Sequence, residues 1–307
     1  MPISQNVDGV LNDELNKFDH IVVLMLENRS FDNLLGYLYQ DGVPVNKSFS
    51  GLQDKIYSNP VPKRALGYDA HKTISTSRAV DYSQPYPDPG EEYQHINTQL
   101  FGEVDSYNIG KLTAKMKAPY NLPTAPLPSP SMDGFINDYE SNLEATYNHG
   151  SNNSTPVPIT YDKYRVIMQC FQPDQVNVLS TLAKEFAVFD HWHCSVPSQT
   201  WCNRAFWHAG TSGGKVINPI DEDGEKIGED VVDMATWAKD VWIQPTLFGK
   251  MKAAGISYGI YSPFENIVPL TSLIHGEFER THLFDTFFLH LDLHQRPQYV
   301  LLEPQFL

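Results

Sequence analysis

The chain has 307 residues, 41% hydrophobic and 19% charged, which describes a globular chain long enough for one large domain or two small ones. Its formal net charge of −15 argues against nucleic acid as a partner and against electrostatic docking on anionic membranes. No apolar stretch reaches transmembrane length, and the N-terminus lacks the features of a signal peptide, so the expected compartment is the cytoplasm. Three cysteines fit neither a disulfide framework nor a zinc pattern, although a Cys194–Cys202 bridge stays open for an exported chain.

The first expected element is a strand over residues 20–26, because this short, β-branched apolar run is typical of a strand buried on both faces. A helix is expected from Phe31, with Ser30 as its N-cap. Glu27 and Asn28 would then lie at the carboxyl end of a buried strand, where ligands bind in open α/β sheets. Two adjacent oxygen ligands suit a hard or borderline divalent cation, and a plain polar turn explains them about equally well.

Long loops and regular elements occupy different parts of the remaining chain. Residues 40–70, 72–90 and 117–131 are rich in loop-forming residues and are expected to be loop insertions. Periodicity and end signals predict helices over 175–186 and 245–254, and strands over 186–189, 256–261 and 299–302. This alternation favours an α/β fold with a mostly parallel sheet flanked by helices.

The second segment with candidate chemistry surrounds Thr200, at the start of an expected helix near Trp201. A hydroxyl there lies at the positive end of the helix dipole, where backbone N–H groups can hold an anion. If a divalent metal also contacts this hydroxyl, it loses its proton more easily and becomes a nucleophile. Asn203 and Arg204 fall within reach of the same anion. The alternative is that Thr200 is only an N-cap and Arg204 a solvated helix residue.

Histidines also gather near this segment, at His191, His193 and His208, while His71, His95 and His275 are scattered. A histidine is more often a hydrogen-bonded structural residue than a ligand or a base. Their spacing does not choose between these roles.

Two segments, read together, resemble a known family. Residues 20–36 read HIVVLMLENRSFDNLLG, and residues 186–214 read FAVFDHWHCSVPSQTWCNRAFWHAGTSGG. The first resembles the Glu-Asn-Arg-Ser-Phe-Asp signature of bacterial and plant phosphoesterases, which include phosphatidylcholine-type and non-specific phospholipases C and a related acid phosphatase. The second resembles the nucleophile segment of that family. MDGFINDY and FQPDQVNVLSTLAKEFAVFDHW are similar to its connecting segments, so the resemblance runs from about residue 18 to the end.

The resemblance implies an alkaline-phosphatase-like α/β fold and a metal-assisted hydrolase of phosphoric esters. By position, Glu27 and Asn28 would be metal ligands. Thr200 would be the nucleophile, forming a phosphothreonine intermediate and also contacting the metal. Asn203 and Arg204 would hold the phosphate. The cofactor is then a divalent metal ion, and Ca²⁺, Mg²⁺, Mn²⁺ and Zn²⁺ all stay open.

The chain departs from the family pattern at three places. Cys202 replaces a usual Pro, with little expected effect, and Glu91 replaces a usual active-site His. The family also continues past its Glu-Pro strand, here Glu303-Pro304, into a His-Pro segment and an Asp-Glu-x-Gly-Gly motif that supply further metal ligands, whereas this sequence stops at Leu307. The expectation is a single phosphoesterase domain over 1–307 that lacks its C-terminal part.

The leading functional hypothesis is therefore a phospholipase C-type enzyme acting on a phosphoester or phospholipid. Alternatives are an acid phosphatase or a sulfatase-like hydrolase of the same fold, or a catalytically impaired fragment that only binds. Tryptophans would suit a choline cage through cation–π contacts, but an aromatic core explains most of them better. The sequence determines neither the head group nor the oligomeric state.

Overall fold

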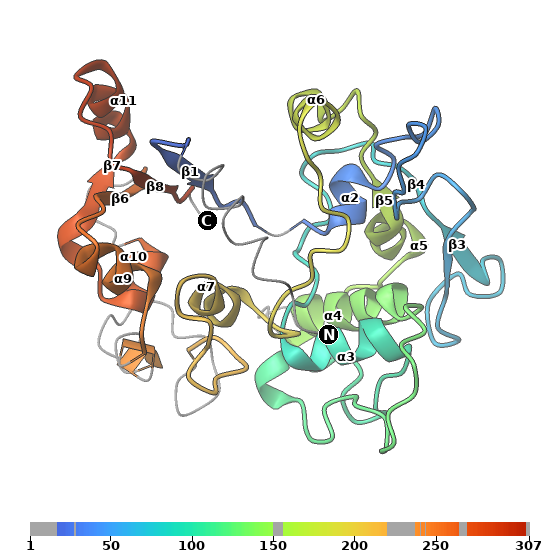
Figure 1. The fold of residues 1–307 in the computed structure, drawn as a ribbon. Coiled ribbons are helices and arrows are strands. Elements are labelled where there is room, and N and C mark those ends of the chain that lie inside the picture. Colours follow the sequence, from blue (N-terminus) through green and yellow to red (C-terminus); the bar gives the residue numbers. More distant parts are fainter. Residues whose placement is uncertain are drawn as a thin grey trace. The chain divides into compact units, whose positions relative to one another are not determined.

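The computed structural model describes residues 17–27, 29–149, 156–219, 237–239, 241–242, 244–263 and 269–304. Contacts within the chain divide it into two compact units, which we describe separately (Figure 1). We call the first the sheet unit; it comprises Met1–Glu27, Thr200–Pro219 and Lys226–Leu307. The second unit comprises Asn28–Gln199 and Ile220–Glu225.

The sheet unit is built on four parallel strands in the order β1-β8-β6-β7. Its described elements in chain order are β1 (Ile21–Leu24), α7 (Thr200–Ala209), α9 (Leu247–Ala253), β6 (Tyr258–Ser262), α10 (Leu270–His275), the 3₁₀ helix η3 (Phe278–Arg280), β7 (Thr281–Leu283), α11 (Phe284–Asp292) and β8 (Tyr299–Leu302). The strands predicted over 256–261 and 299–302 and the helix predicted over 245–254 correspond to β6, β8 and α9. The predicted α/β class with a parallel sheet is confirmed.

Helices flank both faces of this sheet because alternate strand residues are apolar on both sides. On one face, Phe248 and Met251 of α9 pack with a row from three neighbouring strands, namely Val23, Tyr258, Ile260, Tyr299 and Leu301. On the other face, Tyr261 packs edge-on against Phe287 of α11, with ring centroids 5.4 Å apart. The Thr246 side chain begins α9 by accepting the Gly249 N–H at 3.0 Å, and Gly255 follows the helix with a φ of 70°.

The strand at the edge of the sheet differs from its prediction. Residues 20–26 were expected to be buried on both faces, but β1 covers only Ile21–Leu24, and Ile21, Val22 and Leu24 are each more than half exposed. The physical reason is strand order, because among the described residues β1 pairs with β8 alone. An apolar run indicates a strand without indicating how many neighbours it has.

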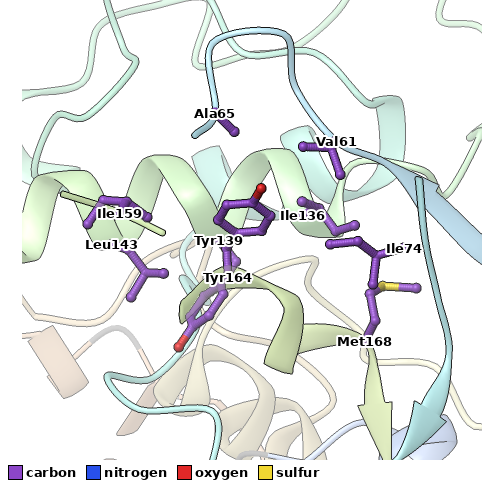
Figure 2. Packing of buried hydrophobic residues seen from close by; sticks show 9 residues of the cluster. All are labelled: Val61, Ala65, Ile74, Ile136, Tyr139, Leu143, Ile159, Tyr164 and Met168. Atoms are coloured by element: carbon purple, nitrogen blue, oxygen red, sulfur yellow. The ribbon is translucent and has the colours of Figure 1, made fainter. Parts of the chain in front are cut away.

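Among the regular elements of the second unit, helices predominate over short two-stranded ladders. Its elements are α2 (Phe31–Leu35), β2 (Ser58–Pro60), β3 (Thr73–Ser75), β4 (Ser77–Arg78), α3 (Tyr93–Phe101), η1 (Thr113–Lys115), α4 (Phe135–His149), α5 (Tyr161–Tyr164), η2 (Arg165–Met168), β5 (Gln169–Cys170) and α6 (Asn177–Glu185). Its core forms where Ile136, Tyr139 and Leu143, at helical spacing on α4, meet the segments around them (Figure 2). The other buried members are Val61, Ala65, Ile74, Ile159, Tyr164 and Met168.

The elements predicted in this unit fare unequally. The helix expected over 175–186 is α6, Ser30 caps α2 by accepting the Asn33 N–H at 3.2 Å, and residues 117–131 contain no helix or strand. The strand predicted over 186–189 is wrong, because those residues have no strand partner and Phe186 and Phe189 are 78% and 70% exposed. Helix α6 extends to Glu185, and the short apolar run after it forms an irregular link.

None of the described helices is both long and apolar enough to cross a membrane. The three cysteines are free thiols; Cys170 and Cys202 are buried and Cys194 is exposed. Burial raises the pKa of the Cys170 and Cys202 thiols to about 12, so both are protonated at neutral pH.

Candidate active site

The candidate site lies at the carboxyl ends of β1 and β8 in the sheet unit. Glu27 follows β1 by three residues, and Glu303 follows β8 directly. Because the two strands are parallel and in register, their carboxyl ends meet at one edge of the sheet. Backbone hydrogen bonds continue past the strands, from the Met25 N–H to the Leu302 oxygen at 3.2 Å and from the Glu303 N–H to the Tyr261 oxygen at 2.8 Å. The second bond ties the backbone of Glu303 to β6, and the first continues the β1–β8 pairing to Met25, two residues before Glu27.

The structure places Thr200 beside Glu27, although 172 residues separate them in the sequence. The Thr200 hydroxyl Oγ1 donates to Glu27 Oε2 at 3.2 Å. Both side chains are half-buried, so the pair is shielded but reachable from solvent. Asn28, the predicted partner of Glu27, lies outside the described residues.

Thr200 is the first residue of α7, close to the helix start predicted at Trp201. Its hydroxyl therefore lies at the positive end of the helix dipole. The next backbone N–H, that of Trp201, donates to Asn218 Oδ1 at 3.0 Å. Asn203 is half-buried in the first turn of the same helix, so its amide is on the same helix end as Thr200.

Arg204 is the second predicted residue that the fold brings to Glu27, and its guanidinium lies between two carboxylates. Its Nε donates to Glu27 Oε1 at 2.5 Å, and its Nη1 donates to Glu303 Oε2 at 3.3 Å. Nη1 also lies 3.4 Å from the Thr271 hydroxyl on α10. The Arg204 side chain is only 2% exposed. Sequence reasoning placed Arg204 on the phosphate, whereas here two of its nitrogens face carboxylates of the chain itself.

Glu303 lies in the same cluster of side chains as Glu27, Thr200 and Arg204, but it was not predicted from the sequence as a site residue. It is 1% exposed, and the Thr271 backbone N–H donates to its Oε2 at 3.0 Å. The sequence did contain a signal for Glu303, because this carboxylate directly follows a correctly predicted strand. Glu27 likewise follows a strand, three residues after its end. What the sequence did not provide was the pairing of that strand with β1.

Burial raises the pKa of the Glu27 carboxyl above its ordinary value. The Arg204 guanidinium and the Thr200 hydroxyl lower this pKa in part, and the Glu303 carboxylate adds to the rise. The ionised form of Glu27 is thus incompletely compensated by its neighbours. A further positive charge near Oε2 would stabilise that form.

Two buried histidines meet where α7 packs against α10, with His208 on α7 and His275 on α10. His208 Nε2 lies 3.0 Å from the Tyr299 hydroxyl, and its ring stacks on Phe248 at 4.4 Å. His275 Nε2 lies 3.4 Å from the Arg204 backbone oxygen. Burial lowers the pKa of His208 to about 2 and that of His275 to about 4, so both are neutral at pH 7.

The other histidines raised by the sequence are in the second unit. His95 is buried there, with Nδ1 2.7 Å from Asp138 Oδ1 and Nε2 3.1 Å from the Thr113 hydroxyl. His71, His191 and His193 are exposed. His95 therefore has the contacts of a structural residue that joins α3 to α4 and η1.

The donor chemistry at Glu27 and Thr200 fits a hard divalent cation. Glu27 Oε2 and Thr200 Oγ1 are oxygen donors 3.2 Å apart, near enough to share one ion. Within the described ranges, however, no group of three or more His, Cys, Asp or Glu side chains is arranged to hold a metal. Alone, Glu27 and Thr200 would therefore be too few ligands to fill the coordination shell of such a cation.

The amino-acid sequence is similar to those of known proteins. The sequence profile of the Phosphoesterase family matches residues 18–298. Non-specific phospholipase C3 of Arabidopsis thaliana is 29% identical over 292 residues, which is 93% of this chain and 45% of the relative. Non-specific phospholipases C6 and C1 of the same plant are each 29% identical over 80% of this chain, covering 35% and 34% of their lengths. The chain spans less than half the length of these curated relatives.

Proposed function

The chain belongs to the phosphoesterase family, and from this membership we propose that it hydrolyses phosphoric esters in the manner of a phospholipase C, with Thr200 as the nucleophile. The observation that carries the proposal is the 3.2 Å hydrogen bond from Thr200 to Glu27 at the carboxyl edge of the parallel sheet. It brings a hydroxyl and a carboxylate together at a helix N-terminus, where an anionic phosphoryl group is stabilised.

The first step forms a bond between Thr200 Oγ1 and phosphorus as the bond from phosphorus to the leaving alcohol breaks. The hydroxyl proton is released to solvent as this bond forms, and the leaving alcohol takes a proton from solvent. The product is a phosphothreonine ester, on which a phosphodiester substrate keeps its head group. Water then attacks this ester, releases the phosphate product and restores the hydroxyl.

Asn203 would hold the phosphoryl oxygens during both steps, and its position one turn from the nucleophile on α7 supports this role. A divalent cation held by Glu27, Asn28 and Thr200 would polarise the phosphoryl group and ease the loss of the hydroxyl proton. Its identity among Ca²⁺, Mg²⁺, Mn²⁺ and Zn²⁺ is a matter for experiment, because oxygen donors accept all four.

The test compares the full chain with Thr200→Ala and Thr200→Ser on p-nitrophenyl phosphorylcholine, p-nitrophenyl phosphate and p-nitrophenyl sulfate. The expected result is hydrolysis of a phosphoester, abolished by Thr200→Ala and by chelation, partly kept by Thr200→Ser, and restored when a divalent metal is added back. The matched control is Thr286→Ala, a half-buried threonine on α11 outside the cluster.

The preferred substrate separates the hypotheses about the reaction. Hydrolysis of p-nitrophenyl phosphorylcholine supports a phospholipase C-type enzyme. Hydrolysis of p-nitrophenyl phosphate alone supports an acid phosphatase, and hydrolysis of p-nitrophenyl sulfate supports a sulfatase-like enzyme. Wild-type activity of a correctly folded Thr200→Ala variant would remove Thr200 from the mechanism.

A further inference from the structure

Glu27, which the proposed reaction uses, is linked to two buried charged residues that it does not use, first to Arg204 and through Arg204 to Glu303. We propose that Glu303 is a positioning residue, which acts through Arg204 to hold the Glu27 carboxylate with one oxygen turned toward Thr200. This inference rests on the proposed function, because it assigns a purpose to the orientation of Glu27. It also changes the expected role of Arg204, from a phosphate contact to the link between two carboxylates.

The geometry divides the two oxygens of Glu27 between two tasks. Oε1 accepts from Arg204 Nε, and Oε2 accepts from the Thr200 hydroxyl. A carboxylate free to rotate would exchange these oxygens and leave the nucleophile without a fixed partner. The guanidinium prevents this rotation only if it is itself held in place, because arginine has a long and flexible side chain.

Glu303 holds the Arg204 guanidinium in place, and Glu303 is itself fixed by a backbone hydrogen bond. Arg204 Nη1 donates to Glu303 Oε2 at 3.3 Å, and the same oxygen accepts the Thr271 backbone N–H at 3.0 Å. Glu303 thus ties together the end of β8, the start of α10 and the second turn of α7. Arg204 Nη1 also reaches the Thr271 hydroxyl at 3.4 Å, so both ends of the Arg204–Glu303 contact touch α10.

The exposure of the three side chains differs in the way that a positioning role for Glu303 requires. The Arg204 and Glu303 side chains are each 2% exposed, whereas the Glu27 side chain is 16% exposed. Arg204 and Glu303 are therefore screened from a substrate in solvent, and Glu27 is the member that reaches the surface. Their influence on the reaction must pass through Glu27.

Charge gives Glu303 a second effect on the same oxygen. Two carboxylates and one guanidinium sum to one negative charge, which attracts a cation to Glu27 Oε2 and Thr200 Oγ1. Without the Glu303 charge the three residues would be neutral. Groups that orient a metal ligand in this way alter metal affinity or activity roughly 10–100-fold when removed.

The test measures Mn²⁺ affinity by calorimetric titration and kcat and KM for p-nitrophenyl phosphorylcholine, in folded Glu303→Gln and Glu303→Asp variants. Glu303→Gln is expected to weaken Mn²⁺ binding about tenfold or more and to lower kcat with little change in KM. Glu303→Asp keeps the charge and should retain part of both. Arg204→Lys, which keeps a positive charge but loses the planar fork, should reproduce the Glu303→Gln effect.

The matched control is Glu277→Gln in the same unit. Glu277 is also buried, and it forms an ion pair with Lys252 at 2.8 Å. Among the described residues, no ion pair or hydrogen bond found in the structure joins Glu277 to Arg204 or Glu27. Its loss should lower the melting temperature and leave Mn²⁺ affinity unchanged. A merely structural role for Glu303 predicts the same pattern for Glu303→Gln.

Wild-type Mn²⁺ affinity and kcat in folded Glu303→Gln would overturn the inference and leave the proposed function standing. If Glu303→Gln does not fold, Glu303→Asp decides, because weakened Mn²⁺ binding supports the inference and unchanged binding overturns it. Absence of both Mn²⁺ binding and phosphoester turnover in the wild type would instead overturn the proposed function, and the inference with it.

Discussion

At the scale of single residues, the site depends on where the Glu27 carboxylate is held. Its two oxygens contact different partners, Arg204 and Thr200, and both contacts lie inside one compact unit. Both contacts depend on the length and the orientation of the Glu27 side chain. The length of the Glu27 side chain should therefore matter as much as its charge.

Glu27→Asp tests this directly. The aspartate keeps the negative charge but withdraws the carboxylate by one methylene from both partners. We expect kcat to fall roughly a hundredfold, since a displacement of about 1 Å in a catalytic group has an effect of that size. Steady-state kinetics with far-ultraviolet circular dichroism as a folding check measures it. Near wild-type kcat would mean that charge alone, without position, accounts for the role of Glu27.

The residues of the site also show what sequence patterns can and cannot predict. Glu27 and Thr200 were singled out because each stands at the end of a recognisable element, and the fold brings them together. Arg204 was predicted to hold the phosphate, which stays untested. Its contacts with Glu27 and Glu303 were not predicted, because a position on a helix does not reveal which side chains other segments bring to it. Glu303 was overlooked, since its contact with Arg204 exists only once β8 pairs with β1.

At the scale of elements, α7 and α10 pack against each other over a pair of neutral histidines. The rings of His208 and His275 are 5.2 Å apart, and burial lowers the pKa values of both. In the unfolded chain each would take up a proton near its ordinary pKa of about 6.5. In the folded chain His275 does so near pH 4 and His208 near pH 2.

The unfolded state therefore binds more protons than the folded state at acidic pH, and stability falls as the pH drops below about 6.5. Each histidine contributes up to about 1.4 kcal/mol per pH unit, His275 down to about pH 4 and His208 further. Urea unfolding from pH 7 to pH 5 should show this slope, and His208→Gln should flatten it. The control His71→Gln, at an exposed position, should leave the slope unchanged. An equal slope in wild type and His208→Gln would contradict this reading.

Element predictions succeeded where both the pattern and its ends were clear. Helix α9 has a capping threonine at one end and a glycine at the other, and β8 has the predicted bounds. The strand predicted over 186–189 does not form, because four apolar residues do not specify a partner strand. The prediction that β1 is buried on both faces also failed. An edge strand and a central strand can have the same sequence, so the sequence did not show that β1 lies at the edge of the sheet.

At the scale of the whole molecule, the contacts form two units, while the Phosphoesterase profile runs through both of them, from residue 18 to 298. That residues 1–307 form a single domain stays a prediction. All the described members of the cluster, Glu27, Thr200, Arg204, Thr271 and Glu303, belong to the sheet unit. The chemistry proposed for them therefore depends on the fold of that unit.

The central claim is that Thr200 becomes covalently bound to phosphorus during turnover. The most direct measurement is to quench the enzyme in acid during hydrolysis of p-nitrophenyl phosphorylcholine and analyse the peptide containing Thr200 by mass spectrometry. We predict a burst of p-nitrophenol and a phosphocholine group on Thr200, both absent from Thr200→Ala. An unmodified Thr200 peptide despite a burst, or wild-type turnover by Thr200→Ala, would contradict the account.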